Sequence, residues 1–396
     1  MRRIHLGIVT LLAVIAVLTT SVGYAATPAP DATPATADAP VGDVTPAIDD
    51  ALVPQEVPTS ERTTAIDPSA KWYGMVVGRL DDRGFNALSW GGMLLAGEQH
   101  GVNVDEAAAF DSATIRAGIS RFVNLGFDGI ITVGSDMADA TREESLENPD
   151  LPFATVDVPS QTPGTVGLLF DVDEPSFMAG YLAAGTSKNA TVCTYGGIQI
   201  PPVMAFMVGF ENGVAYYNGQ KSADVKVLGW KSDPQNPKGG EGEFIGDWES
   251  GDKAAAITGK LADDGCDVIF PVAGGAGLGS LPIAQERGML VVGVDADQAL
   301  TNPEYADLYL TSVVKHTDLV VLETIKHMEE GTFRGGTNFV GKLVNGAVDL
   351  APFHAFEDKV PQEMKDELTA IRQGLTESSL KTGWPIFGTL KPKAKP

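Results

Sequence analysis

The stretch WYGMVVGRLDDRGFNALSWGGMLLAGEQHG, residues 72–101, decides the fold class. It begins with an apolar run typical of a buried strand, and its second half has the apolar content and the closing glycine of a helix. The turn between them carries Asp81 and Asp82, then an aromatic ring and an amide, Phe85 and Asn86. A strand that leads directly into a helix is the repeating unit of parallel α/β sheets, whose ligands bind at the carboxyl ends of the strands. We therefore expect Phe85 and Asn86 to face a ligand and the two acids to cap the helix or order the loop.

The same alternation continues along the chain. Apolar strand-like runs alternate with helical segments in two series, which break near residue 186. Strands of this kind imply parallel sheets covered on both faces, so we expect an α/β protein with two doubly wound lobes. A helical segment at residues 316–331 and a strand pair around residues 338–353 follow the second series. We expect these segments to cross back between the lobes and form a hinge.

This reading divides the chain into five parts. The expected ranges are residues 1–25 for an export signal, 26–68 for a tether, 69–186 for lobe 1 (completed by about 312–340), 187–311 for lobe 2 (completed by about 341–375) and 376–396 for a C-terminal tail. The tether is rich in Pro, Ala, Thr and acids and is expected to be disordered, because it cannot bury enough apolar surface to offset its ordering entropy.

The N-terminus predicts export. MRRIHL supplies positive charge, GIVTLLAVIAVLTTSV an apolar core, and GYA a small-x-small site ending at Ala25. No cysteine lies near Ala25, which excludes lipid attachment at that point. The apolar core also approaches the ~17–25 residues that a bilayer span needs, so an uncleaved membrane anchor is the alternative to cleavage. We expect a periplasmic or cell-surface protein.

Charge and cysteine content exclude several classes of protein. The net charge of -24 argues against nucleic acid as a partner, because phosphates need Lys and Arg. Only two cysteines are present, Cys193 and Cys266, which excludes a CxxC redox pair or a two-cysteine metal knuckle. Outside the cytosol they are compatible with one disulfide, and equally with two buried thiols.

Polar and aromatic side chains gather at the strand ends of both series. The candidate ligand-binding residues are Phe85, Asn86, Asp157, Trp248, Gly274, Asp295 and Lys315, with Asp81 and Asp82 as secondary candidates. Aromatic faces from two lobes would sandwich a flat ring, at ~1–3 kcal/mol per stacked base. Asp295 would accept both hydroxyls of a ribose, with Lys315 donating to the same sugar. Asn86 and Asp157 would read the edge of the base, so the set indicates a nucleoside.

Six motifs in order carry a family resemblance. They are DDRGFNALSWGG, DEPSFMAGYLAA, TYGGIQIPPVMAFMVGFENG, IFPVAGGAGLG, VVGVDADQ and LTSVVKH. From about residue 71 to 355 the chain resembles the basic membrane protein family of ABC-transporter substrate-binding proteins, whose best-known members are purine-nucleoside receptors. The resemblance implies a type I periplasmic-binding-protein fold that closes over its ligand, with an ABC permease and its ATPase as partners.

The resemblance also implies a role for each matching position. It makes Phe85 one stacking wall, Asn86 and Asp157 partners of the base, Asp295 and Lys315 partners of the ribose, and Gly274 a backbone contact. This sequence departs from the family at the second stacking wall, where Trp248 stands in place of the usual phenylalanine, and it lacks the lipidation cysteine that is common in the family.

These observations predict a monomeric, extracytoplasmic binding protein that delivers a nucleoside to an ABC importer. The nucleoside is expected to be a purine nucleoside. The alternative is the same fold binding a sugar-like or other small ligand for uptake or sensing, because this fold serves all of these functions. An enzyme such as a nucleoside hydrolase is disfavoured, since the sequence has no HExxH or GxSxG pattern and no clustered carboxylates for a metal. We expect no cofactor.

Overall fold

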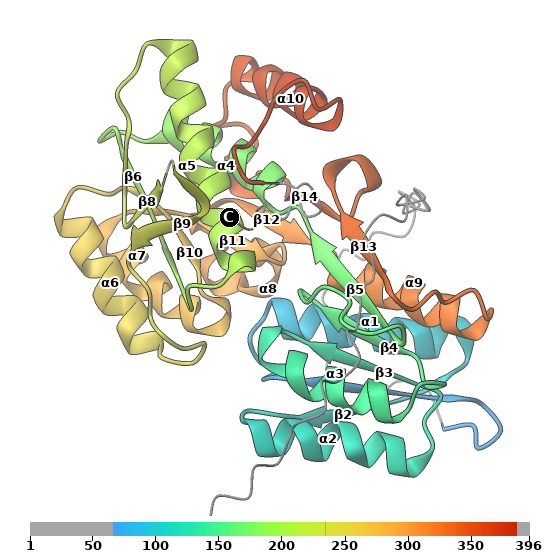
Figure 1. Cartoon of the computed structure of the whole chain (residues 1–396). Helices are drawn as coiled ribbons and strands as arrows, with labels where there is room; N and C mark the ends of the chain where they lie inside the picture. Colours follow the sequence, from blue (N-terminus) through green and yellow to red (C-terminus); the bar gives the residue numbers. More distant parts are fainter. Residues whose placement is uncertain (1–65, 234, 386–396) are drawn as a thin grey trace, which may run out of the picture. The chain divides into compact units, whose positions relative to one another are not determined.

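The structure, a computed structural model, describes residues 66–233 and 235–385 (Figure 1). The predicted export signal, nearly all of the predicted tether and the end of the C-terminal tail lie outside these residues. Within the described part of the chain, no helix combines the length and the apolarity needed to cross a bilayer.

The first sheet has six strands in the order β13-β5-β4-β3-β1-β2, and every neighbouring pair is parallel. Its strands are β1 (Trp72–Val77), β2 (Asn103–Ala108), β3 (Gly129–Val133), β4 (Phe153–Val156), β5 (Thr165–Phe170) and β13 (Thr337–Gly341). The helices α1 (Phe85–His100) and α9 (Thr317–Glu329) pack together on one face of this sheet, and α2 (Ser112–Leu125) and α3 (Ala138–Glu147) pack together on the other (Figure 1).

The second sheet has six strands in the order β14-β12-β11-β10-β6-β7, parallel except for the last strand, β14, which is antiparallel to β12. Its strands are β6 (Thr191–Gly196), β7 (Lys226–Leu228), β10 (Val268–Val272), β11 (Leu290–Asp295), β12 (Tyr309–Lys315) and β14 (Val348–Leu350). The covering helices are α4 (Asp173–Thr186) with α5 (Pro201–Lys221), and α6 (Gly251–Asp263) with α7 (Ser280–Arg287), while α10 (Gln362–Thr376) packs on α4.

The sequence explains why these segments become buried strands. All residues of β3 and β10 are buried, as expected of apolar runs that have helices on both faces of their sheet. Asp111 is the N-cap residue of α2, and its carboxylate accepts hydrogen bonds from the N–H groups of Ala113 and Thr114 in a capping box. The α/β class with two lobes built on parallel sheets, predicted from the sequence, is confirmed.

The chain passes between the sheets three times within the described residues: from β5 to β6, from β12 to β13, and from β13 to β14. The strands β13 and β14 do not pair with each other, so the strand pair expected around residues 338–353 is wrong: each strand extends a different sheet. The helix α4 packs against α5, β12 and β14 of the second sheet. These contacts favour a lobe boundary before Asp173 rather than at residue 186.

Two further features lie in the second lobe. Cys193 in β6 and Cys266, just before β10, form a disulfide with a Cα–Cα distance of 5.9 Å. An antiparallel hairpin of β8 (Trp230–Asp233) and β9 (Asn236–Gly242) follows β7. This hairpin was not predicted from the sequence.

Candidate functional site

A cavity of about 660 Å³ lies at the carboxyl ends of strands from both sheets. Strands β1, β3 and β4 of the first sheet and β10, β11 and β12 of the second lead into it. All nine residues selected from the sequence line this cavity: Asp81, Asp82, Phe85, Asn86, Asp157, Trp248, Gly274, Asp295 and Lys315. The structure thus brings the whole set together, and the role of each residue in ligand binding stays a prediction.

The two acids of the turn after β1 serve the protein itself. The buried carboxylate of Asp82 accepts the N–H groups of Gly84, Asn86 and Ala87 at 3.1, 2.8 and 3.1 Å, which satisfies the start of α1. Burial raises the pKa of Asp82 from its ordinary value, against the opposing effect of these hydrogen bonds. Exposed Asp81 instead pairs with Arg79 at 2.6 Å.

The first turn of α1 presents Phe85 and Asn86 to the cavity. Both side chains are half-buried. The amide of Asn86 lies beside the backbone at Gly78, where a Cβ would come within 3.1 Å of Nδ2. The capping of α1 by Asp82 therefore fixes the backbone from which the ring and the amide project.

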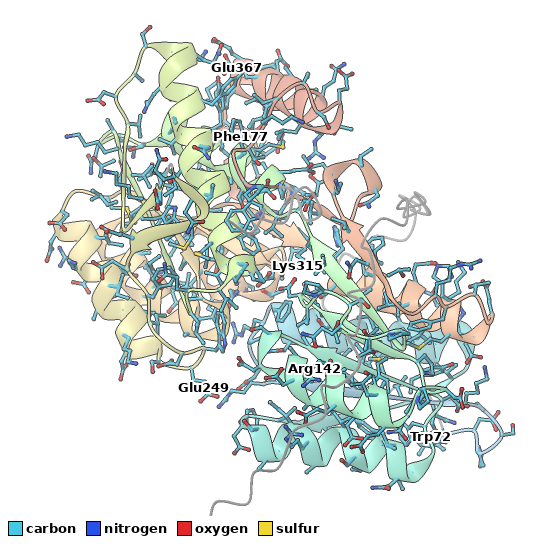
Figure 2. All side chains as sticks on the ribbon, in the orientation of Figure 1. Trp72, Arg142, Phe177, Glu249, Lys315 and Glu367 are labelled. Carbon is cyan, nitrogen blue, oxygen red and sulfur yellow. A yellow bond between two sulfur atoms is a disulfide. The ribbon has the colours of Figure 1, made fainter. Side chains whose placement is uncertain are left out.

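Lys315 is the charged centre of the cavity, at the end of β12 (Figure 2). Its side chain is 2% exposed, and Nζ donates to Oδ2 of Asp157 at 2.6 Å and lies 3.7 Å from Oδ1 of Asp295. Three phenyl rings surround the ammonium group, with Nζ-to-centroid distances of 4.6, 5.4 and 5.5 Å for Phe85, Phe170 and Phe206. The ion pair of Lys315 with Asp157 connects the two lobes, because Lys315 ends β12 of the second sheet and Asp157 follows β4 of the first sheet.

Asp295 carries an unused acceptor. It is buried, and its Oδ1 has no hydrogen-bond partner among the described residues. Burial raises the pKa of Asp295 to about 6; Lys315 opposes the rise, whereas the charges of Asp157 and Asp82 add to it. A buried acceptor without a donor is costly to leave unpaired, so this oxygen is suited to receive a donor from a ligand.

Trp248 lies on the second lobe's side of the cavity, supported by glycine backbone. A Cβ at Gly197 would lie 2.3 Å from its Cζ3, and one at Gly274 would lie 3.7 Å from its Cε3. Gly274 has φ 53°, in the left-handed region. Next to the tryptophan, the carboxylate of Asp247 accepts hydrogen bonds from the Ser250 N–H and the Lys253 ammonium, which orders the loop.

Arg83 connects the lobes outside the cavity. Its guanidinium donates to Oδ1 of Asn302 at 3.0 Å and to Oε1 of Glu304 at 2.6 Å. In return the hydroxyl of Thr301 donates to the carbonyl of Arg83 at 3.1 Å. These partners lie in and after the short helix α8 (Gln298–Thr301) of the second lobe.

Several cavity residues escaped the sequence analysis. Phe206, which lines the cavity, and Phe170, which contacts Lys315, sit inside apolar runs and look like ordinary core residues. Exposed Phe110, which lines the cavity, follows the end of β2. Its position directly after a strand could have identified it as a cavity residue. Arg79 lies two residues beyond β1 and offered the same signal.

Comparison with known proteins gives the family. A family model described as "ABC transporter substrate-binding protein PnrA-like" matches residues 71–239 and 241–378. The chain is 27% identical over 278 residues to "Basic membrane protein A" of Borreliella burgdorferi, covering 68% of this chain and 74% of that protein. It is 26% identical over 349 residues to the "CD4+ T-cell-stimulating antigen" of Listeria innocua, covering 82% and 91%.

Solved structures share the fold. A solute-binding protein of an ABC transporter system from Aeropyrum pernix superposes with a TM-score of 0.68 at 20% identity, covering 79% of this chain and 92% of that one. A transcriptional activator of the comK gene from Bacillus halodurans superposes with a TM-score of 0.64 at 20% identity, covering 78% and 99%. At this identity the likeness shows the fold alone.

Proposed function

Since this chain belongs to the PnrA-like family of ABC transporter substrate-binding proteins, we propose that it binds a nucleoside, and a purine nucleoside by preference, in the cavity between its lobes. Its partners would be a membrane permease and an ATPase, and it would act outside the cytoplasm as a monomer. Family members are typically non-enzymatic, so the task of the site is to hold the ligand and release it.

The unpartnered Oδ1 of Asp295 carries this proposal. It is a buried acceptor on a residue that lines the cavity, 3.7 Å from the Lys315 ammonium. A vicinal diol supplies two neutral hydroxyl donors to a carboxylate and acceptor oxygens to a lysine. Ribose has such a diol, and it would satisfy both groups without bringing a further charge into the cavity.

Aromatic side chains of both lobes support a flat ring as the other half of the ligand. Phe85 comes from the first lobe and Trp248 from the second, and both line the cavity. Stacking on such rings contributes roughly 1–3 kcal/mol per base and tolerates any base that has a π face. The amide of Asn86, next to Phe85, would then hydrogen-bond to the edge of the base.

Calorimetry tests the proposal. The protein, unfolded and refolded to remove any carried-over ligand, would be titrated with guanosine, inosine, adenosine, cytidine, uridine, ribose and free bases. We expect binding of purine nucleosides and none of ribose. Binding of ribose alone would instead support the sugar-like alternative, and no binding of any nucleoside by the folded protein would overturn the proposal.

Substitution of Asp295 tests the diol contact. Asp295→Ala should weaken nucleoside binding at least about 100-fold, because a hydrogen bond to a charged group contributes about 1.5–3 kcal/mol, roughly tenfold to 100-fold in affinity, and two such bonds are lost. Asp263→Ala is the control, since Asp263 is exposed, pairs with Arg287 and does not line the cavity. Unchanged affinity in Asp295→Ala would contradict the assigned site.

A further inference from the structure

The indole of Trp248 rests on a residue that has no room for a side chain. At Gly197 a Cβ would come within 2.3 Å of Cζ3 and 2.6 Å of Cε3 of Trp248, closer than real Cβ atoms approach. The next nearest atom, Cα of Ala273, would be 3.3 Å away. The conflict is therefore with the indole.

The backbone around this contact is held in place. Gly197 donates its N–H to the carbonyl of Val272 at 2.9 Å and accepts the N–H of Gly246 at 2.8 Å. The carbonyl of Trp248 accepts the N–H of Ala276 at 3.0 Å. Because both backbones are bonded to the same strand-end region, a methyl group at residue 197 would be relieved by moving the indole rather than the chain.

The indole of Trp248 is only partly buried, and it lines the cavity. Cβ atoms at Gly197 and at Gly274 would both approach the six-membered ring of the indole. A ring displaced from Gly197 therefore has room to move into the space that the ligand would occupy. A displacement of about 1 Å is enough to disturb a stack of rings, since base and wall meet at van der Waals distance.

We propose that Gly197 is a positioning residue that, by lacking a side chain, lets the indole of Trp248 lie far enough back to admit a flat base. The proposal rests on the proposed function and deepens it. Trp248 replaces the smaller ring expected from the family resemblance, and the atoms that a side chain at residue 197 would meet, Cζ3 and Cε3, belong to the six-membered ring of the indole. The ligand class it selects is a planar heterocycle that stacks on the indole.

A double-mutant cycle tests this role. Gly197→Ala should weaken binding of guanosine about tenfold or more, as expected for overpacking. In a Trp248→Phe background, whose smaller ring lacks the atoms in conflict, the same change should alter the affinity less than about twofold. Gly219→Ala in α5 is the matched control, because nothing lies within 4 Å of a Cβ at that position.

The cycle also has a readout without ligand. Urea unfolding should show that Gly197→Ala lowers the free energy of unfolding in the Trp248 protein and leaves it nearly unchanged in Trp248→Phe. Equal losses in both backgrounds, in affinity or in stability, would overturn the proposal. If the parent protein binds no nucleoside, the proposed function fails, and the unfolding cycle still decides whether Gly197 positions Trp248.

Discussion

The buried carboxyl group of Asp295 should make ligand binding depend on pH. Its pKa is raised to about 6, first by burial, and the opposing charge of Lys315 does not cancel this. Only the ionised form accepts both hydroxyls of a diol, so nucleoside affinity should fall as pH is lowered through about 6, by about tenfold at pH 5. Calorimetry of the parent and of Asp295→Asn between pH 8 and 5 checks this. An equal pH dependence in both proteins would contradict it.

The effect of the same group on folding has the opposite sign. Its pKa in the folded protein lies above the ordinary value of 3.8, so the folded state binds the proton more tightly than the unfolded state. The contribution of Asp295 to stability is therefore fully present below pH 3.8 and is lost as pH rises through about 6. In the unliganded protein this residue therefore favours folding at the low pH at which its proposed binding to a diol should weaken.

At the scale of single residues, the sequence predicts where polar groups emerge but not which of them bind each other. Asp157 and Lys315 were assigned to the base and to the ribose, whereas the structure joins them directly at 2.6 Å. Their contact depends on the approach of two lobes, which no local pattern encodes. Phe170 and Phe206 beside them were missed because an apolar side chain near a cavity has the same sequence signature as one in the core.

At the scale of elements, we expect the contact of the β1–α1 loop with the region of α8 to lengthen the time for which a ligand stays bound. Arg83 does not line the cavity, and its bonds to Asn302 and Glu304 link the lobes. Arg83→Ala should therefore speed nucleoside dissociation about threefold to tenfold, because the closed arrangement of the lobes loses exposed polar contacts that contribute modestly to its stability. The order of preferred nucleosides should stay unchanged. Stopped-flow fluorescence measures the rate.

Arg116→Ala is the control for this prediction. Arg116 pairs with Glu143 within the first lobe, and its side chain is exposed to a similar degree as that of Arg83. It should leave the dissociation rate unchanged. If the nucleoside dissociates from both variants at the parent rate, the contact of Arg83 does not stabilise the closed arrangement of the lobes.

Elements with a strong apolar pattern were predictable, and those without one were not. The strands β1, β3 and β10 are almost wholly buried, and burial on both faces requires the apolar runs that identify them. The hairpin of β8 and β9 has glycine and proline in its second strand and no alternation of apolar residues. The edge strands β13 and β14 have apolar residues, but their choice of different sheets depends on the lobes as a whole.

At the scale of the whole molecule, charge should exclude phosphorylated ligands. The chain has a net charge of -24. The carboxylates that line the cavity are Asp81, Asp82, Asp111, Asp136, Asp157, Glu249 and Asp295, against the cations Arg79 and Lys315 (Figure 2 labels Glu249 and Lys315). Guanosine monophosphate should therefore bind about 100-fold more weakly than guanosine, because like charges in a cleft repel the phosphate.

Salt dependence separates electrostatic repulsion of the phosphate from steric exclusion of a bulky 5′ group. Raising the ionic strength screens charge beyond about 10 Å and should narrow the difference between guanosine and its monophosphate. Guanosine with an uncharged 5′ substituent of similar size is the control, and it should show no such salt dependence. Equal affinity for nucleoside and nucleotide at low salt would contradict the prediction.

The strand β13 is far from the rest of its sheet in the sequence, and this has a consequence for the chain during its synthesis. The first sheet receives this strand, the parallel neighbour of β5, only after the parallel strands of the second sheet have been synthesised. Until then β5 is an unpaired edge, which is a template for pairing with other chains. This edge therefore stays open to such pairing while the residues between Phe170 and Thr337 are synthesised, and a product that stops before Thr337 completes neither sheet.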